Sequence, residues 1–421
     1  MSRRLRALPA LAALALVASA CSEDTSPSDK ADPVGGVPVE ITDSTPEDPV
    51  RIGVVVTLRS EDGLGEGLLS AAAGAQVAES RLELGGGEVM LEVADDRGTA
   101  EGARAAISDL VGQDVSGIVV ATTGDHLTAA LRAASDAGTP VVAPYLRDPS
   151  LDLPGVWATG PDDPTIAERL QETLDADGLL RPFVVTGDGV AVDVDAAASG
   201  SLDATGPKEL ARQVARRARS GGVDSVVVGA SAPNQAAFVA ALQGADTDVP
   251  VHLTPEALSP EFASALVEAG GTTMGDMATV GTDATDATSL GQGDRAEAVA
   301  AYFAALRLLA GDPEAKDLFG SAPFAQEADG ADIASHDAVV GLVVAAAEAD
   351  SVDPAAVKDA LAGLQLTRAQ GLAGPPLDFT DASALDREEV VVLRSSGQDP
   401  GVRPVSSGDP VLRWFAVPTE D

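Results

Sequence analysis

The stretch GEGLLSAAAGAQVAESRLELGGGEVMLEVADDRG (residues 65–98) holds a helix, a stop and a strand in one run. Small and apolar residues recur at helical spacing over residues 64–84, and three glycines at 85–87 end that pattern. The apolar run at 88–94 then indicates a strand, and RIGVVV at 51–56 indicates another before the helix. The chain therefore opens with a strand–helix–strand unit.

The same alternation continues toward the C-terminus. Further strands are predicted at 117–121, 139–145, 182–187, 223–230, 249–255 and 273–281, and further helices at 99–113, 126–138, 165–178, 208–222, 233–245 and 259–271. Two longer helices follow near 292–311 and 334–349, then strand-like segments at 388–394 and 411–417. This order predicts an α/β fold of doubly wound parallel sheets. The length exceeds one ordinary core and predicts two lobes.

The first residues have the pattern of an export signal. Three arginines precede a small and apolar run at 7–20, which is too short to cross a bilayer. Ala18, Ser19 and Ala20 stand directly before Cys21 and resemble a bacterial lipobox. We expect residues 1–20 to be a signal peptide and Cys21 to carry a lipid on the outer face of the cytoplasmic membrane. The alternative is a plain secretory signal with a chance cysteine. Residues 21–50 are rich in Ser, Asp and Pro and predict a disordered tether.

Composition argues against several classes of function. The formal net charge of −39 repels phosphate backbones and anionic lipids, so no nucleic-acid partner is expected. The chain has one cysteine and cannot form an internal disulfide. No phosphate-binding loop, nucleophile elbow or zinc-protease motif is present. The three histidines, His126, His252 and His336, lack metal-ligand spacing. We therefore expect no catalytic residues, no metal and no cofactor.

Four stretches together resemble the type I periplasmic binding proteins, in the branched-chain amino-acid branch that serves ABC importers. They are residues 65–98, VVAPYLRDPSLDLPGVWATGPDD (141–163), ASHDAVVGLVVAAAEADSVDPAAVKDAL (334–361) and GLAGPPLDFTD (371–381). The resemblance implies a monomer that passes a small polar, amino-acid-like ligand to a permease.

The resemblance also implies a division of the chain into two lobes. Lobe I would be residues 51–158 plus 282–376, and lobe II residues 159–281 plus 377–421. The chain would cross near 157–160, 280–283 and 375–379. Ligands of such sheets lie beyond the carboxyl ends of the strands, and the lobes close around them.

In lobe I the resemblance implies that hydroxyls and backbone N–H groups at a helix start hold a ligand carboxylate. Thr122, Thr123 and Asp125 occupy that loop. Asp125 either contacts the ligand or caps its own helix. The next loop carries Tyr145 and Arg147. Arg147 either binds a carboxylate through two parallel hydrogen bonds, or pairs with a neighbouring acid, or lies in solvent.

In lobe II, Glu256 in LTPEAL (253–258) matches the family glutamate that accepts the ligand's ammonium group; otherwise it is one more surface acid. Ser231 stands where the family often has an aromatic residue. Residues 190–206 are too short and too rich in small residues for the usual helix and strand. The sequence thus predicts a lipid-anchored solute-binding protein. The alternative is a sensory or scaffold lipoprotein that keeps the fold without a ligand.

Overall fold

A computed structural model describes residues 38–42, 45–60, 65–148, 152–245, 247–404 and 410–416. They belong to one compact unit, Val37–Asp421. The predicted signal peptide, Cys21 and the first part of the predicted tether lie outside the described residues. Among the helices that are described, none combines the length and the apolar character that a membrane span requires.

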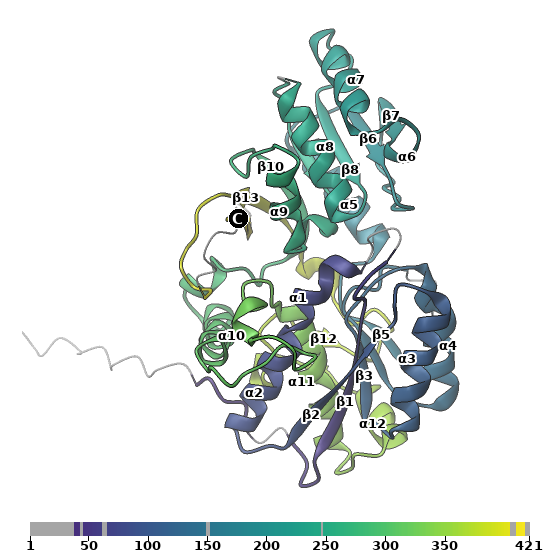
Figure 1. Cartoon of the computed structure of the whole chain (residues 1–421), viewed down its shortest axis with the longest axis vertical. Helices are drawn as coiled ribbons and strands as arrows, with labels where there is room; N and C mark the ends of the chain where they lie inside the picture. Colours follow the sequence, from purple (N-terminus) through teal and green to yellow (C-terminus); the bar gives the residue numbers. More distant parts are fainter. Residues whose placement is uncertain are drawn as a thin grey trace, which may run out of the picture. The chain divides into compact units, whose positions relative to one another are not determined.

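Lobe I is built on a five-stranded parallel sheet in the order β2-β1-β3-β4-β5. Its strands are β1 (Val50–Val56), β2 (Val89–Asp95), β3 (Gly117–Val120), β4 (Val141–Ala143) and β5 (Val156–Ala158). Helices α3 (Ala100–Gly112) and α4 (Thr128–Ala137) cover one face, as Figure 1 shows. Helices α2 (Gly74–Leu84), α11 (Ile333–Glu348) and α12 (Pro354–Leu361) cover the other.

Both faces of this sheet are apolar because helices bury both. Val54 of β1 packs with the core of α2 and α11, whereas Val55 points to the opposite face and packs with Ile107 and Leu110 of α3. A strand that is buried on both sides reads as a continuous apolar run, which is what RIGVVV shows. The predicted parallel doubly wound sheet is confirmed for this lobe.

Lobe II is built on a seven-stranded sheet in the order β14-β13-β10-β9-β8-β6-β7. Its strands are β6 (Pro182–Thr186), β7 (Ala198–Ser201), β8 (Ser225–Gly229), β9 (Val251–Leu253), β10 (Met277–Thr282), β13 (Val390–Ser396) and β14 (Arg413–Ala416). Helix α5 (Asp163–Ala176) packs on one face, and α7 (Pro207–Arg219), α8 (Ala232–Gly244) and α9 (Glu261–Glu268) pack on the other. The predicted parallel sheet is confirmed for β6 to β10, and the strand-like segments β13 and β14, for which no direction was predicted, run antiparallel at the edge.

The remaining elements are one long helix, α10, and a set of short segments. They are η1 (Glu66–Leu68), α1 (Leu69–Ala72), η2 (Asp125–Leu127), α6 (Leu202–Thr205), η3 (Pro255–Leu258), η4 (Thr288–Leu290), α10 (Asp294–Ala310), η5 (Phe324–Gln326), β11 (Gln365–Leu366), η6 (Arg368–Gln370), β12 (Leu377–Asp378) and η7 (Arg387–Glu389). The segment 190–206 does form a strand, β7, followed only by the single turn α6. The expected absence of a strand there was wrong.

Two predicted boundaries differ from the structure. Lobe II was expected to restart at residue 377, but β12 pairs with β11 and Phe379 packs edge-on against Trp157 in the lobe I core. The tether was expected to reach residue 50, but Ile41 is 5% exposed and its N–H donates to Arg81 O at 3.0 Å. The alternation Val37, Val39, Ile41 is too short to predict an element, so the burial of Ile41 becomes clear only from its tertiary contacts. The lobe ranges otherwise stay a prediction.

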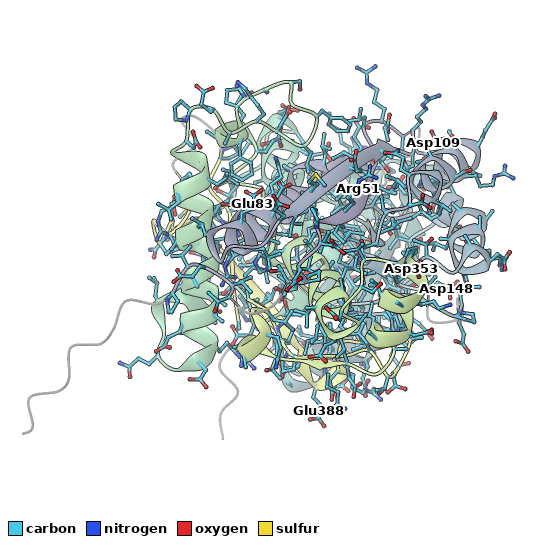
Figure 2. The ribbon with its side chains drawn as sticks, turned by 90° about the horizontal axis from the view of Figure 1, so that it is seen from below. Arg51, Glu83, Asp109, Asp148, Asp353 and Glu388 are labelled. Carbon is cyan, nitrogen blue, oxygen red and sulfur yellow. The ribbon has the colours of Figure 1, made fainter. Side chains whose placement is uncertain are left out.

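Charged side chains lie mostly on the outside. In Figure 2, Asp109 on α3, Asp353 before α12 and Glu388 on η7 lie at the surface, and all three are exposed. The net charge therefore reflects mainly hydrated side chains at the surface.

Candidate functional site

A cavity of about 740 Å³ lies where the carboxyl ends of the two sets of parallel strands meet. Loops that follow β3, β4 and β5 line it from lobe I, and loops that follow β8, β9 and β10 line it from lobe II. Parallel strands place these loops at one sheet edge, which is where open α/β sheets bind ligands. Of the predicted site residues, Thr123, Tyr145, Arg147, Ser231 and Glu256 line the cavity.

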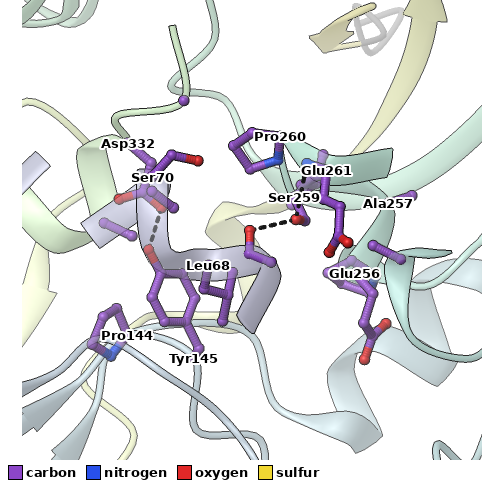
Figure 3. Close-up of a pocket in the computed structure, with 18 of the residues that line it drawn as sticks. Leu68, Ser70, Pro144, Tyr145, Glu256, Ala257, Ser259, Pro260, Glu261 and Asp332 are labelled. Atoms are coloured by element: carbon purple, nitrogen blue, oxygen red, sulfur yellow. Dashed lines mark hydrogen bonds between the residues drawn. The ribbon is translucent and has the colours of Figure 1, made fainter. Parts of the chain in front are cut away.

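Tyr145 is held at the lobe I wall by its hydroxyl. The hydroxyl donates to Asp332 Oδ2 at 2.5 Å and lies 2.8 Å from Ser335 Oγ, both at the start of α11 (Figure 3). Thr123 Oγ1 donates to Tyr145 O at 3.1 Å. Burial raises the pKa of Asp332 and also the pKa of Tyr145. The wall thus presents a fixed phenol and a carboxylate with little hydration.

Thr122 and Asp125 do not line the cavity. Thr122 is buried, and its Oγ1 lies 2.5 Å from Thr57 Oγ1, which in turn donates to Asp96 Oδ1 at 2.8 Å. Asp125 is exposed at the start of η2, whose N-cap is Gly124 with φ 133° and no side-chain cap. Neither role that the sequence suggested for Asp125, cap or ligand contact, has geometric support. Asp125 stays a prediction from resemblance alone.

Arg147 and Glu256 meet across the cavity. Arg147 Nη1 lies 2.6 Å from Glu256 Oε1, and the two side chains are 19% and 12% exposed. Arg147 follows β4 in lobe I, and Glu256 lies in η3 of lobe II. Of the three roles considered for Arg147, the structure shows an ion pair, and its partner is Glu256. This contact joins the two lobes directly.

The surroundings of Glu256 fix its carboxylate. Thr254 Oγ1 donates to its Oε2, and Gln235 Nε2 lies 3.4 Å from the same oxygen. Gln235 is fully buried and also donates to Ala230 O and to Thr254 Oγ1 at 2.8 Å each. Ser231, at the start of α8, is bound through its backbone N–H to Asp188 Oδ2 at 2.9 Å. Only Oε1 of Glu256 is therefore left to face the cavity.

A second contact joins the lobes at the cavity rim and was missed in the sequence. Ser259 Oγ donates to Gly67 O at 2.7 Å, as Figure 3 shows beside Glu261. A Cβ on Gly67 would lie 2.5 Å from Glu261 Oε2 and 2.8 Å from Ser259 Oγ. A side chain at position 67 would therefore displace the ends of these two side chains. The helix-start glycines in GEGLL were the available signal.

Other polar cavity residues also went unpredicted. Asp332 caps α11 through Ser335 N at 2.9 Å, and an aspartate directly before an apolar helix was a readable signal. Burial, with Glu66 as a further cause, raises the pKa of Glu261. Thr159 follows β5 and is 8% exposed; its Oγ1 has no hydrogen-bond partner among the described residues. Nothing in the local sequence marks Thr159.

The far wall of the cavity contains a buried charge cluster. Arg403 Nε lies 2.9 and 3.0 Å from the two carboxylate oxygens of Asp286, and Arg413 Nε lies 3.3 Å from Asp286 Oδ2. Arg413 also pairs with Asp329 at 2.6 Å. These two arginines are therefore already neutralised by lobe I acids.

The histidines lie apart from the cavity. His126 Nε2 lies 2.7 Å from Asp96 Oδ2, His336 sits between Arg81 and Asp337, and His252 is buried in the lobe II sheet. Burial lowers the pKa of His336 and of His252. Among the residues that the structure describes, no three His, Cys, Asp or Glu side chains form a metal-binding group.

Comparisons with known proteins agree with this architecture. A family model described as periplasmic binding protein matches residues 49–388. A search of curated proteins found no match.

Solved structures share the fold at low identity. The branched-chain amino acid transporter substrate binding protein LivJ from Streptococcus pneumoniae, solved with isoleucine, is 16% identical with a TM-score of 0.62; the match covers 88% of this chain and 99% of that one. A type 1 periplasmic binding protein from Bordetella pertussis is 19% identical with a TM-score of 0.61, covering 88% and 100%. An ABC transporter substrate-binding protein from Desulfitobacterium hafniense, solved with Leu, is 18% identical with a TM-score of 0.58, covering 85% and 99%.

Proposed function

The chain belongs to the periplasmic binding protein family, and on that premise we propose that it is an extracytoplasmic, lipid-anchored solute-binding protein of an ABC importer. It captures a small polar, amino-acid-like ligand as its two lobes close, and it hands the ligand to a permease. The observation that carries the proposal is the cavity between the lobes, with opposite charges facing each other from its two walls. We assign no catalytic step and no cofactor, and we expect a monomer.

The anchor is proposed from the sequence alone. Cys21 follows an export-like segment and would hold the protein at the outer face of the cytoplasmic membrane through its lipid. In cells fed a labelled fatty acid, the wild-type chain should carry label and sediment with membranes. Cys21→Ser should lose both. Label that persists in Cys21→Ser would contradict the anchor.

Ligand capture is tested on the full-length chain. Native mass spectrometry would identify a co-purified small molecule, and a thermal-shift screen of amino acids, short peptides and small organic acids would follow. A ligand-dependent rise in Tm that Glu256→Ala abolishes supports the proposal. Asp109→Ala, which removes an exposed acid on α3, is the matched control and should leave the shift intact.

A second function has one specific observation in its favour. Arg147–Glu256 and Ser259–Gly67 bridge the lobes directly through protein groups. A sensory or scaffold lipoprotein that retains the fold would use such a closed form for contacts with other proteins. An empty chain whose Tm no compound raises would favour this alternative.

A further inference from the structure

The Arg147 guanidinium already occupies the acceptor that a bound cation would use. It lies 2.6 Å from Glu256 Oε1, the only oxygen of that carboxylate left free by Thr254 and Gln235. Any ligand that reaches this point must separate the pair. The charge of the ligand decides which partner is displaced.

A cation displaces Arg147, and an alternative partner is near. Asp163 begins α5, its N–H donates to Arg147 O at 3.1 Å, and the electrostatic interaction of its carboxylate with Arg147 favours its charged form. Partial burial, opposed by Arg147, raises the pKa of Asp163. A released guanidinium would therefore stay paired with an acid.

A bound anion would displace Glu256 from Arg147. Glu256 would then find no second cationic side chain among the described cavity residues to replace Arg147 as its partner. Of the arginines among the described cavity residues, Arg403 and Arg413 are held by Asp286 and Asp329. The carboxylate of Glu256 would then remain desolvated beside Asp163, whose charge repels it. Elsewhere on the cavity wall, Glu66 and Glu261 form no ion pair with any residue that the structure describes, and a charge on either side chain adds to the negative potential.

We propose that Arg147 is a built-in competitor that determines specificity, and that the cavity selects a small organic cation, an alkylammonium or guanidinium, which replaces Arg147 at Glu256. The proposal rests on the proposed function and narrows its ligand class. An internal competitor weakens apparent affinity because only the fraction of molecules with a vacant acceptor can bind.

The test is isothermal titration calorimetry of the full-length chain in detergent with agmatine and putrescine as cations, glutarate as the anion and leucine as the zwitterion. The cations should bind and glutarate should not. Arg147→Ala should tighten cation binding at least tenfold. Arg147→Lys keeps a competing charge and should bind cations within a few-fold of wild type. Glu256→Gln should lose cation binding.

Three results would overturn the inference. Glutarate binding that Arg147→Ala removes would make Arg147 an anion receptor. Leucine binding without cation binding, or cation binding that Arg147→Ala leaves unchanged, would show that Arg147 is no competitor; in these cases the proposed function survives. Binding of no probe to wild type or Arg147→Ala would count against both proposals. If circular dichroism shows that Arg147→Ala does not fold, Arg147→Gln takes its place, because glutamine keeps most of the length of the arginine side chain.

Discussion

At the scale of single residues, Arg403 and Arg413 both pair with Asp286, and Arg413 also pairs with Asp329. Asp286 has a side chain that is 5% exposed, and it neutralises both Arg403 and Arg413. Arg403 also lies over the Phe303 ring, 5.0 Å from its centroid. Removal of one partner from a buried ion pair leaves uncompensated charge.

Asp286→Ala should therefore lower the free energy of unfolding by about 3 kcal/mol, since two neighbouring arginines would be left facing each other. Urea denaturation at pH 7 measures the loss. Asp381→Ala, a change at an exposed acid, is the control and should stay within about 0.5 kcal/mol of wild type. A loss for Asp286→Ala no larger than the control's would contradict the role of the cluster.

Glu79 on α2 gives stability a dependence on pH. Burial first, then Glu83, raises the pKa of Glu79 from 4.5 to about 7. Between pH 4.5 and about 7, Glu79 keeps its proton in the folded state but loses it in the unfolded chain. The contribution of Glu79 to the free energy of unfolding is therefore fully present below pH 4.5 and is lost as the pH rises through about 7.

Glu79→Gln mimics the protonated form, so its stability relative to wild type should be similar at pH 4.5 and greater above pH 7. Thermal unfolding at a series of pH values measures the difference. Glu88→Gln changes the net charge equally at an exposed position and should show no such trend. A Glu79→Gln difference that is flat with pH would contradict the assignment.

At the scale of elements, helix α2 touches the backbone before α11. A Cβ on Gly74 would lie 1.9 Å from Asp332 O, so no side chain fits. The same packing positions Asp332, which holds Tyr145 at the cavity wall. The contact of two helices thus determines the position of a site residue.

Gly74→Ala should lower the free energy of unfolding by about 2 kcal/mol despite the better helix propensity of alanine, because the backbone must move. Gly112→Ala in α3 is the matched change, since a Cβ there meets nothing within 4 Å. It should raise stability by up to about 1 kcal/mol. Equal effects of the two changes would contradict the close approach.

At the scale of the whole molecule, direct contacts between protein groups join the two lobes at the cavity. Arg147–Glu256 and Ser259–Gly67 both join lobe I to lobe II. Beyond β13 the chain returns to lobe I, where Val402 O accepts from Arg307 Nη1 on α10, before it enters β14. The contact of this segment with α10 therefore adds a connection between the lobes beyond the three expected crossovers.

The double variant Glu256→Ala with Ser259→Ala should shift the chain toward a more open form, because it removes the two links at the cavity; Arg413–Asp329 and Arg295–Glu389 remain. Small-angle X-ray scattering should show a larger radius of gyration than wild type. Glu268→Ala with Ser220→Ala removes the same groups from exposed positions of lobe II and should leave the scattering unchanged. An unchanged profile for the first pair would mean that the remaining ion pairs and packing keep the lobes closed.

The sequence by itself determined the succession of strands and helices, because buried parallel strands and helix stops are local patterns, as RIGVVV and the glycines at 85–87 show. It also placed Tyr145, Arg147 and Glu256 at strand ends, which the topology brings to one cavity. Only the tertiary structure decided that Arg147 pairs with Glu256, that Ile41 is buried, and that Gly67 and Gly74 stand against other segments. The physical reason is that these contacts join residues far apart in the chain, and no periodicity in either segment encodes the identity of its partner.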